Sequence, residues 1–241
     1  MACISPLSLP NPAGEGRITV SCNKCATCLK ARRAEWSFRL AEELRVSANG
    51  WFIGIDYSDE NLIQEDYQDG QYTGMYSIRL HTEHVQKYIK RVRRIKERTV
   101  QKYIKDNKAF PDESYIKKVK YFAVGEYGTK SHRPHYHIII FNIPREIRRK
   151  IADSWKYGRT HFGIAEMASI RYTAKYVLKD DSIMLCSRGI GKAYLSKAKW
   201  HEENKIEYVT TVDTRTGADI KQKIPRYYQD KIGIHKENIN I

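Results

Sequence analysis

The sequence contains no run of about 18 apolar residues, and its first residues lack the charged and then apolar pattern of a secretion signal. We therefore expect neither a membrane-spanning helix nor export, but a soluble protein that stays in a cytoplasm. Internal repeats and low-complexity segments are also lacking. With 241 residues, of which 41% are hydrophobic, the chain is long enough for one globular domain with appendages.

Acidic residues are scarce relative to basic ones. The chain has 28 Asp and Glu against 43 Lys and Arg, which gives a formal net charge of +15 and a pI near 9.5. This excess favours a polyanionic partner, and nucleic acid is the leading candidate. The alternative is a basic protein whose charges are merely solvated, so the charge needs support from the motifs.

Cysteine is scarce too, yet three of the five cysteines fall within seven residues, at Cys22, Cys25 and Cys28. This spacing suits ligation of one metal ion better than disulfide pairing, and it agrees with a reducing compartment. Together with Cys3, the three residues would make a closed, structural zinc site of four thiolates. An iron–sulfur cluster and three reduced thiols are the alternatives. Cys186 is expected to be an ordinary buried residue.

Hydrophobic periodicity predicts an α+β fold. Strand-like runs are expected at residues 51–57, 120–126, 135–141, 160–167 and 206–212, and helices at residues 29–44, 83–107, 144–155 and 168–179. Strands and helices do not alternate as in βαβ units, so we expect an antiparallel sheet core flanked by helices. The expected division is a cysteine-rich segment (1–30), a main domain (31–180) and a C-terminal accessory segment (181–241).

Two histidines, His135 and His137, open a run of apolar, mostly β-branched residues that reads as a buried strand. Side chains two apart on a strand share a face, so both imidazoles can bind one metal ion. Glu126 lies on the preceding strand, and antiparallel pairing can bring its carboxylate beside them. His132, in the turn between the strands, is the rival third ligand. A His-x-His pair can also be purely structural.

Further along, Tyr172, Lys175, Tyr176 and Lys179 follow at helical spacing, where offsets of three and four residues share one face. Two phenols and two ammonium groups would then face one cleft. The Tyr-x-x-Lys pattern occurs six times in this tyrosine-rich chain, so it is the overlap of two copies on one face that distinguishes this pair. The alternative is that both phenols simply pack against the core.

These groups together suggest a metal-dependent nuclease with a tyrosine nucleophile. A phenol has an ordinary pKa near 10, so attack on phosphorus needs nearby positive charge, which Lys175, Lys179 and the metal ion would supply. The ion would also polarise and orient the scissile phosphate. The expected product is a DNA strand joined to tyrosine through its 5′-phosphate, with a free hydroxyl on the other side of the nick.

With these residues in this order, the chain resembles the HUH endonucleases, a class named for two histidines separated by one bulky residue. More closely, it resembles the replication initiators of small single-stranded DNA phages, the gokushovirus branch of the Microviridae. The motifs that carry the resemblance are Cys22-Asn-Lys-Cys25-Ala-Thr-Cys28 with the following Arg32-Arg33-Ala-Glu-Trp36, then Gly125-Glu126-Tyr127-Gly128, Arg133-Pro134-His135-Tyr136-His137, and Tyr172-Thr-Ala-Lys175-Tyr176-Val-Leu-Lys179. They span roughly residues 1–180.

The resemblance implies that His135, His137 and Glu126 hold Mg²⁺ or Mn²⁺ and that Tyr172 and Tyr176 are paired nucleophiles. In two-tyrosine members of the class, one tyrosine nicks the origin. The other cuts the regenerated origin after a round of rolling-circle synthesis. The chain departs from the family's Thr-Leu-Thr-Tyr-like first motif, because it reads Ile53-Gly54-Ile55-Asp56-Tyr57 there. Asp56 and Tyr57 could still line a DNA groove.

The sequence therefore predicts a site-specific single-stranded DNA nickase and strand transferase that starts rolling-circle replication of a small circular phage genome in the cytoplasm of a bacterial host. The residues expected to contact DNA are Arg32, Arg33, Lys90, Arg91, Arg94 and Arg133. The chain has no Gly-x4-Gly-Lys-[Ser/Thr] loop, so a host helicase would separate the strands and a host polymerase would copy them.

Two other functions are compatible with parts of the pattern. The first is an HUH transposase or plasmid relaxase, although a relaxase typically carries its nucleophile before its histidines. The second is a non-catalytic, zinc-containing protein that binds DNA or RNA. That function would explain the charge and the cysteines but would leave the His-Tyr-His strand and the paired tyrosines without a role.

Overall fold

The computed structural model of the protein describes residues 3–12, 14–62, 64–68, 71–77, 79–179, 181–197, 208–212 and 219–232. The chain divides into two compact units, unit 1 from Met1–Glu42 with Gly191–Ile241 and unit 2 from Glu43–Ile190. None of the helices that the structure describes combines the length and the apolar character needed to cross a membrane.

Unit 2 is built on a five-stranded antiparallel sheet with strand order β8-β3-β7-β6-β9. The strands are β3 (Gly50–Asp56), β6 (Lys120–Tyr127), β7 (Pro134–Phe141), β8 (Thr160–Ile164) and β9 (Ile183–Cys186). The predicted α+β fold with an antiparallel core is confirmed. Strands β6 and β7 form the predicted hairpin, and β7 lies at the centre of the sheet, between β3 and β6.

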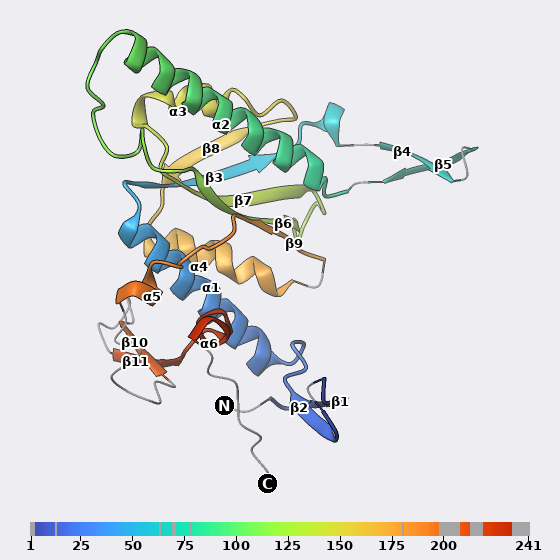
Figure 1. The fold of residues 1–241 in the computed structure, drawn as a ribbon. Helices are drawn as coiled ribbons and strands as arrows, with labels where there is room; N and C mark the ends of the chain where they lie inside the picture. Colours follow the sequence, from blue (N-terminus) through green and yellow to red (C-terminus); the bar gives the residue numbers. More distant parts are fainter. Residues whose placement is uncertain are drawn as a thin grey trace. The chain divides into compact units, whose positions relative to one another are not determined.

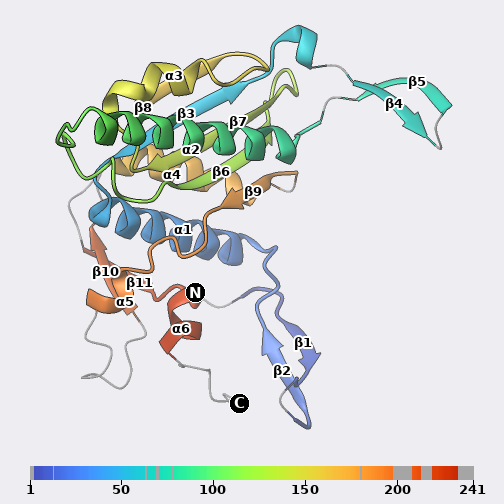
Figure 2. The same ribbon diagram turned by 45° about the horizontal axis from the view of Figure 1, so that its top comes forward.

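Helices cover both faces of this sheet (Figures 1 and 2). On one face lie α2 (Thr82–Lys105) and α3 (Arg148–Ala152), and on the other lies α4 (Met167–Lys175). The alternation of β3 and β7 sends Ile53, Ile55, Tyr136 and Ile138 into the core beneath α2 and α3. Phe52 and His137, at the intervening positions, therefore belong to the α4 face.

Helix α2 is amphipathic, as its sequence predicts, with one difference at its buried stripe. The buried residues are Val85, Tyr88, Ile89, Val92 and Lys96. The sequence pattern places Ile95 at the end of that stripe, whereas the structure leaves Ile95 only partly buried and buries Lys96. The Lys96 ammonium is satisfied there because it donates to the backbone carbonyls of Lys117 and Asn142.

Other elements of unit 2 differ from the predicted pattern in detail. The helix expected over 144–155 is divided into a 3₁₀ helix, η2 (Arg145–Ile147), and the short α3, and the strand expected over 160–167 ends at Ile164. A hairpin with no counterpart in the prediction follows the 3₁₀ helix η1 (Asp59–Asn61); its strands are β4 (Gln64–Gln68) and β5 (Gln71–Ser77).

Unit 1 contains two antiparallel hairpins, β1 (Leu7–Pro10) with β2 (Arg17–Val20) and β10 (Tyr208–Val212) with β11 (Asp219–Lys223). Its helices are α5 (Tyr194–Lys197), α6 (Arg226–Ile232) and most of α1 (Ala26–Val46), which confirms the helix predicted over 29–44. A small core joins Phe38, Val209, Ile224 and Tyr228. The strand predicted over 206–212 is confirmed from residue 208 onward, and its first two residues lie outside the described part.

Candidate metal and tyrosine centre

Glu126, His135 and His137 converge on the α4 face of the sheet. Glu126 on β6 is the direct cross-strand partner of His135 on β7. Its Oε1 lies 2.9 Å from His135 Nε2 and 3.2 Å from His137 Nε2. The predicted group is therefore assembled by strand register alone. His132, the rival third ligand, is exposed in the turn with a φ of 49° and is not part of the group.

The residue between the two histidines anchors the strand from the other face. Tyr136 is 1% exposed, and its ring lies over Gly125, its cross-strand partner. A Cβ at position 125 would stand 2.5 Å from Cε1 of that ring, so only glycine fits under it. The Gly125-Glu126 and His135-Tyr136-His137 motifs therefore interlock, since one face holds the ring and the other holds the ligand atoms.

The donor atoms of the group are suited to a cation. His135 Nδ1 lies 3.1 Å from the carbonyl oxygen of Arg133, which acts as its acceptor and leaves the Nε2 lone pair directed toward Glu126. Burial lowers the pKa of His137 to about 4, so its imidazole is neutral at physiological pH. Two neutral imidazoles and a carboxylate that meet at one point would repel through their lone pairs without a proton or a metal ion between them.

Tyr172 and Tyr176 reach this centre from α4 and the 3₁₀ helix η3 (Tyr176–Leu178). A capping box between Glu166 and Ser169 starts α4, and Ile170, Thr173 and Ala174 are its buried residues. The helix predicted over 168–179 therefore ends early, at Lys175. The two phenol rings nevertheless meet edge to face with centroids 4.9 Å apart.

Both tyrosine rings also contact a histidine of the group. The ring of Tyr176 stacks on His137 with centroids 4.4 Å apart, and Tyr172 meets the same imidazole at 5.0 Å. Phe52 on β3 completes the wall, 6.0 Å from His137 and 6.1 Å from Tyr172. Sequence reasoning missed Phe52, although its parity on β3, opposite to that of Ile53 and Ile55, places it on this face.

The two tyrosines differ in their surroundings. Tyr172 is 45% exposed, whereas Tyr176 is partly buried. Burial raises the pKa of the Tyr176 phenol well above its usual value, and the hydroxyl of Tyr172 and the charge of Glu126 add to the shift. The Tyr176 hydroxyl is therefore protonated at neutral pH unless positive charge is brought to it.

The two lysines of the motif also separate. The ammonium of Lys179 pairs with Oε2 of Glu126 and lies 3.2 Å from the carbonyl oxygen of Tyr127. The ammonium of Lys175 lies 5.9 Å from the centroid of the Tyr176 ring, on an exposed residue. Of the two, it is thus Lys179 that contacts the carboxylate at the centre.

The residues expected to contact DNA do not gather at one place. Lys90 and Arg94 are exposed on α2, on the sheet face opposite to the histidines, and Arg32 and Arg33 lie on α1. The two others are held by the protein itself. Arg91 Nε donates to the carbonyl of Ser154, and Arg133 donates to the carbonyl of Tyr57 and pairs with Asp59.

The first-motif residues also differ in position. Tyr57 is 1% exposed within the core beneath α2, so the suggestion that it lines a DNA groove is wrong. Asp56 is the cross-strand partner of His135, but its carboxylate is engaged with Arg159, 3.1 Å away.

A second group of His and Glu residues, unnoticed in the sequence, lies at the start of α2. His81 Nδ1 is 2.9 Å from Glu83 Oε1, and the ring of His84 lies 4.6 Å from that of His81. Tyr57 lies 3.2 Å from His84 through its hydroxyl, which places this group on the α2 side of the sheet. The tyrosine pair lies on the α4 side.

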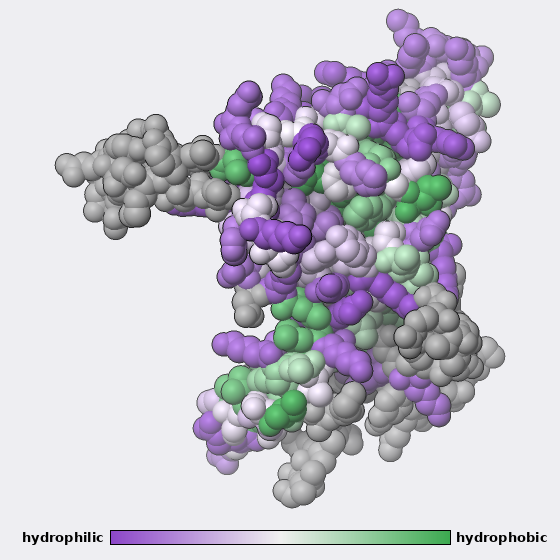
Figure 3. All heavy atoms as spheres, turned by 180° about the vertical axis from the view of Figure 1, so that it is seen from behind, coloured by the Kyte–Doolittle hydropathy of each residue, from purple (hydrophilic) through white to green (hydrophobic). Residues whose placement is uncertain are grey.

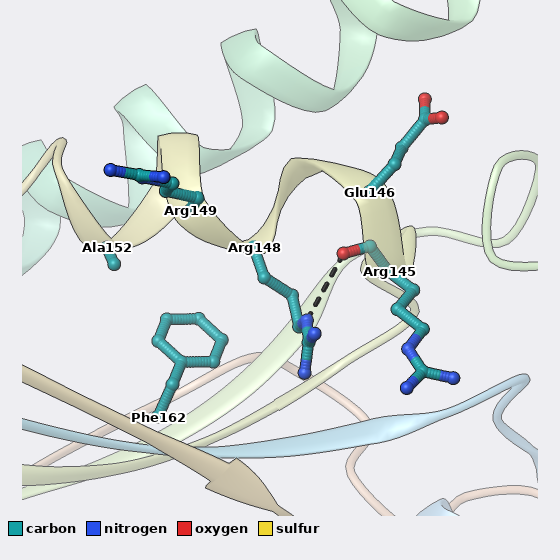
Figure 4. Close-up of a pocket in the computed structure, with 6 residues that line it drawn as sticks. All are labelled: Arg145, Glu146, Arg148, Arg149, Ala152 and Phe162. Carbon is teal, nitrogen blue, oxygen red and sulfur yellow. Dashed lines mark hydrogen bonds between the residues drawn. The ribbon is translucent and has the colours of Figure 1, made fainter.

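Hydrophilic side chains predominate in the upper part of Figure 3, which belongs to unit 2. A surface pocket of about 430 Å³ lies beside α3 and is drawn in Figure 4; it is lined by Arg145, Glu146, Arg148, Arg149, Ala152 and Phe162. The Arg148 guanidinium is held over the ring of Trp51, 4.8 Å from its centroid. The pocket shares no residue with the Glu126 group.

Comparison with known proteins agrees with this fold and arrangement. The chain is 29% identical to the replication-associated protein ORF2 of Spiroplasma virus 4 over 89% of its own length and 68% of that relative. It is 27% identical to the replication-associated protein VP4 of Bdellovibrio phage phiMH2K, over 87% of the chain and 66% of the relative. The replication-associated protein ORF4 of Chlamydia phage 1 is 26% identical over 66% of the chain and 37% of the relative.

No solved structure matches the chain. The sequence profile of the replication-associated protein ORF2 family matches residues 51–181, which include the whole Glu126, His135, His137 and tyrosine centre. This match covers more than half of the chain and confirms the resemblance to phage replication proteins. The chain belongs to the replication-associated protein ORF2 family.

Proposed function

We propose that this protein is a metal-dependent, site-specific single-stranded DNA nickase and strand transferase that starts rolling-circle replication of a small circular phage genome in the cytoplasm of a bacterial host. The observation that carries the proposal is the contact of both tyrosine rings with His137, whose Nε2 lies 3.2 Å from Glu126. A nucleophile and a set of cation ligands then share one centre.

The residues at this centre fit a divalent ion. Glu126, His135 and His137 would hold it through one carboxylate oxygen and two imidazole nitrogens, all within 4.8 Å of one another. Mg²⁺ and Mn²⁺ are the ions we propose. When bound, such an ion polarises a phosphate ester and favours its displacement.

The protein's own groups supply the nucleophile and its surroundings. A phenolic oxygen of Tyr172 or Tyr176 attacks phosphorus, and the bond to the 3′ oxygen of the preceding nucleotide breaks. The tyrosine loses its proton to solvent and the leaving 3′ oxygen gains one. A 5′-phosphotyrosine and a free 3′-hydroxyl result, and the ester linkage conserves the energy needed to rejoin the strand. Lys175 and Lys179 lie near the Tyr176 ring and favour the phenolate form.

Two tyrosines in one centre suit a reaction that cuts twice. While one tyrosine holds the first 5′-phosphate, the second can attack the regenerated origin. The first 5′-phosphate is then open to attack by the newly released 3′-hydroxyl, which closes the displaced circle. The ring contact between Tyr172 and Tyr176 supports this exchange because it places both hydroxyls on the same wall.

The basic side chains would bind the DNA backbone. Exposed cations follow α2 along the sheet face opposite to the tyrosines; they are Lys87, Lys90, Arg93, Arg94, Arg98, Lys102 and Lys105. We propose that they contact phosphates outside the cut site, as do Arg32 and Arg33 on α1. Arg91 and Arg133 instead stabilise the domain through the bonds described above. A host helicase and polymerase would open and copy the duplex.

The test is a covalent adduct. Purified protein is incubated with end-labelled single-stranded DNA of the phage genome and Mn²⁺, and the products are separated on a denaturing gel. An adduct is expected with the wild type and with at least one of Tyr172→Phe and Tyr176→Phe. It should be absent with the double variant and with a chelator. Tyr103→Phe, at the end of α2, is the matched control and should form a normal adduct.

The same gel separates the rival functions. Retention of DNA without any adduct, over all origin-containing fragments, would overturn the nickase proposal and favour a non-catalytic binding protein. An adduct that forms only on DNA from a transposon end or a plasmid transfer origin, and never on phage DNA, would favour a transposase or relaxase.

A further inference from the structure

Four cysteine sulfurs meet in unit 1, at a site that the nickase chemistry does not use. Cys3, Cys22, Cys25 and Cys28 have all their Sγ atoms within 4.8 Å of one another. The separations are 3.5 Å for Cys3–Cys22, 3.8 Å for Cys3–Cys25 and 4.0 Å for Cys22–Cys28. The fifth cysteine, Cys186, lies on β9 in unit 2.

The local fold explains how residues so far apart in sequence come together. In the hairpin of β1 and β2, Leu7 pairs with Val20, so the residues just outside it, Cys3 and Cys22, are brought to the same end. Asn23 then turns the chain with a φ of 59°. Helix α1 begins at Ala26, which places Cys28 in its first turn.

Backbone and hydroxyl groups point at the sulfurs. The N–H of Cys22 donates to Cys3 Sγ, and the N–H of Cys25 donates to Cys22 Sγ, both at 3.3 Å. The Thr27 hydroxyl lies 3.1 Å from Cys25 Sγ. Donors around sulfur favour thiolates, and such a shell of hydrogen bonds is what orients the ligands of a metal site.

The distances distinguish between the possible uses of four cysteines. Zinc binds sulfur at about 2.3 Å, so the edges of a tetrahedral four-sulfur site are about 3.8 Å long. The three measured separations bracket that value. A disulfide needs sulfurs about 2.05 Å apart, which none of these pairs shows. In an iron–sulfur cube each sulfur binds a different iron, which would hold the cysteines farther apart than they are here.

The segment also needs a staple, because it buries little. All four residues of β1 are exposed, and Ile4, Leu7 and Leu9 are 69%, 49% and 45% exposed. Two paired four-residue strands without a buried face are marginal in water. The energy that orders this segment must therefore come from something other than apolar burial.

We infer that Cys3, Cys22, Cys25 and Cys28 bind one Zn²⁺ in a closed, structural site that ties the N-terminal hairpin to the start of α1. All four positions around the ion are filled by sulfur, so no position is open for a water or a substrate. Each thiol releases its proton to solvent as it binds, so folding of this segment is coupled to zinc.

The inference is tested by metal analysis of the full-length chain, purified under reducing conditions without chelators and dialysed against trace Zn²⁺. We expect one zinc per chain in the wild type. Substitution of the zinc by Co²⁺ should give the strong absorption of tetrahedral cobalt thiolates. Cys25→Ser and Cys28→Ser should lose both signals, and the matched control Cys186→Ser should keep both.

Two further measurements separate this site from the centre in unit 2. The Glu126→Gln and His137→Ala variants should retain one zinc and the cobalt spectrum. A strong zinc chelator should speed proteolytic cleavage within residues 1–28 of the wild type, but not within β6 and β7. A wild type without zinc, whether it contains disulfides, iron or four titratable thiols, would overturn the inference. So would a full zinc content in Cys25→Ser. The adduct assay is independent of these outcomes.

Discussion

Glu126 and His135 face each other across β6 and β7, with Oε1 and Nε2 2.9 Å apart, and His137 shares the same carboxylate oxygen at 3.2 Å. The pairing is a consequence of strand register, so it belongs to the folded domain and does not wait for a ligand. The carboxylate is 3% exposed. Its negative charge is held in place mainly by the groups that surround it.

Glu126→Gln should abolish metal-dependent nicking while keeping the fold. The amide has nearly the shape of the carboxylate but lacks its charge, and loss of a cation's polarising effect costs at least about 100-fold in rate. Adduct formation and Mn²⁺ binding by calorimetry measure the effect. Glu83→Gln is the matched control, since Glu83 also lies beside two histidines, on the α2 side. Equal losses in both variants would show that the position of the acid does not matter.

Lys179→Met should separate metal binding from catalysis. The Lys179 ammonium pairs with Glu126, so it competes with a divalent ion for the same carboxylate. Its removal should tighten Mn²⁺ binding several-fold and yet lower the rate of adduct formation at saturating Mn²⁺, because positive charge near the Tyr176 ring is lost. Lys175→Met, which alters an exposed lysine, should leave Mn²⁺ affinity nearly unchanged. Weaker Mn²⁺ binding in Lys179→Met would contradict this assignment.

The two tyrosines should differ in their response to pH. In Tyr172→Phe, the adduct must form through Tyr176, whose pKa is raised by burial, by the Tyr172 hydroxyl and by Glu126. A raised pKa means that the phenolate fraction is small and grows with pH, so the rate should climb throughout about pH 6.5–8.5 at saturating Mn²⁺. The measurement is single-turnover adduct formation. A flat profile in Tyr172→Phe would exclude attack by the Tyr176 phenolate as the pH-dependent step.

Much of the centre could be predicted from the sequence because it depends on local rules. The alternation of β7 puts His135 and His137 on one face, and a short hairpin puts Glu126 opposite them. The tyrosine pair follows from a four-residue offset in a helical segment. Each of these inferences needs only chain geometry over a few residues.

The rest depends on contacts between distant segments. Phe52 meets His137 only because β3 pairs with β7, and the Lys179 contact with Glu126 depends on how α4 packs against β6. Likewise, Lys96 is buried because carbonyl groups of Lys117 and Asn142 happen to face it. A single sequence contains no periodic signal for such pairings.

Gly125→Ala should destabilise the domain. The new Cβ would stand 2.5 Å from the Tyr136 ring and 2.9 Å from Leu80 Cδ2, so the ring must shift and strain the hairpin by about 1–3 kcal/mol. Gly163→Ala on β8 is the matched control, because its Cβ would meet Phe52 at an ordinary 3.9 Å. Urea unfolding followed by circular dichroism gives both free energies of unfolding. Equal stability of the two variants would show that Tyr136 does not need the glycine.

The burial of Lys96 should make stability rise with pH in the alkaline range. Burial lowers the pKa of this ammonium to about 8, whereas in the unfolded chain it stays near 10.5. Between these values the unfolded state binds more protons than the folded state, so the free energy of unfolding increases with pH. From about pH 8 to pH 10 the wild type should gain about 2 kcal/mol relative to Lys96→Met. The buried tyrosines are common to both chains, so their effect cancels in the comparison. Parallel stability curves for the two proteins would mean that Lys96 keeps its proton in the folded state throughout this range.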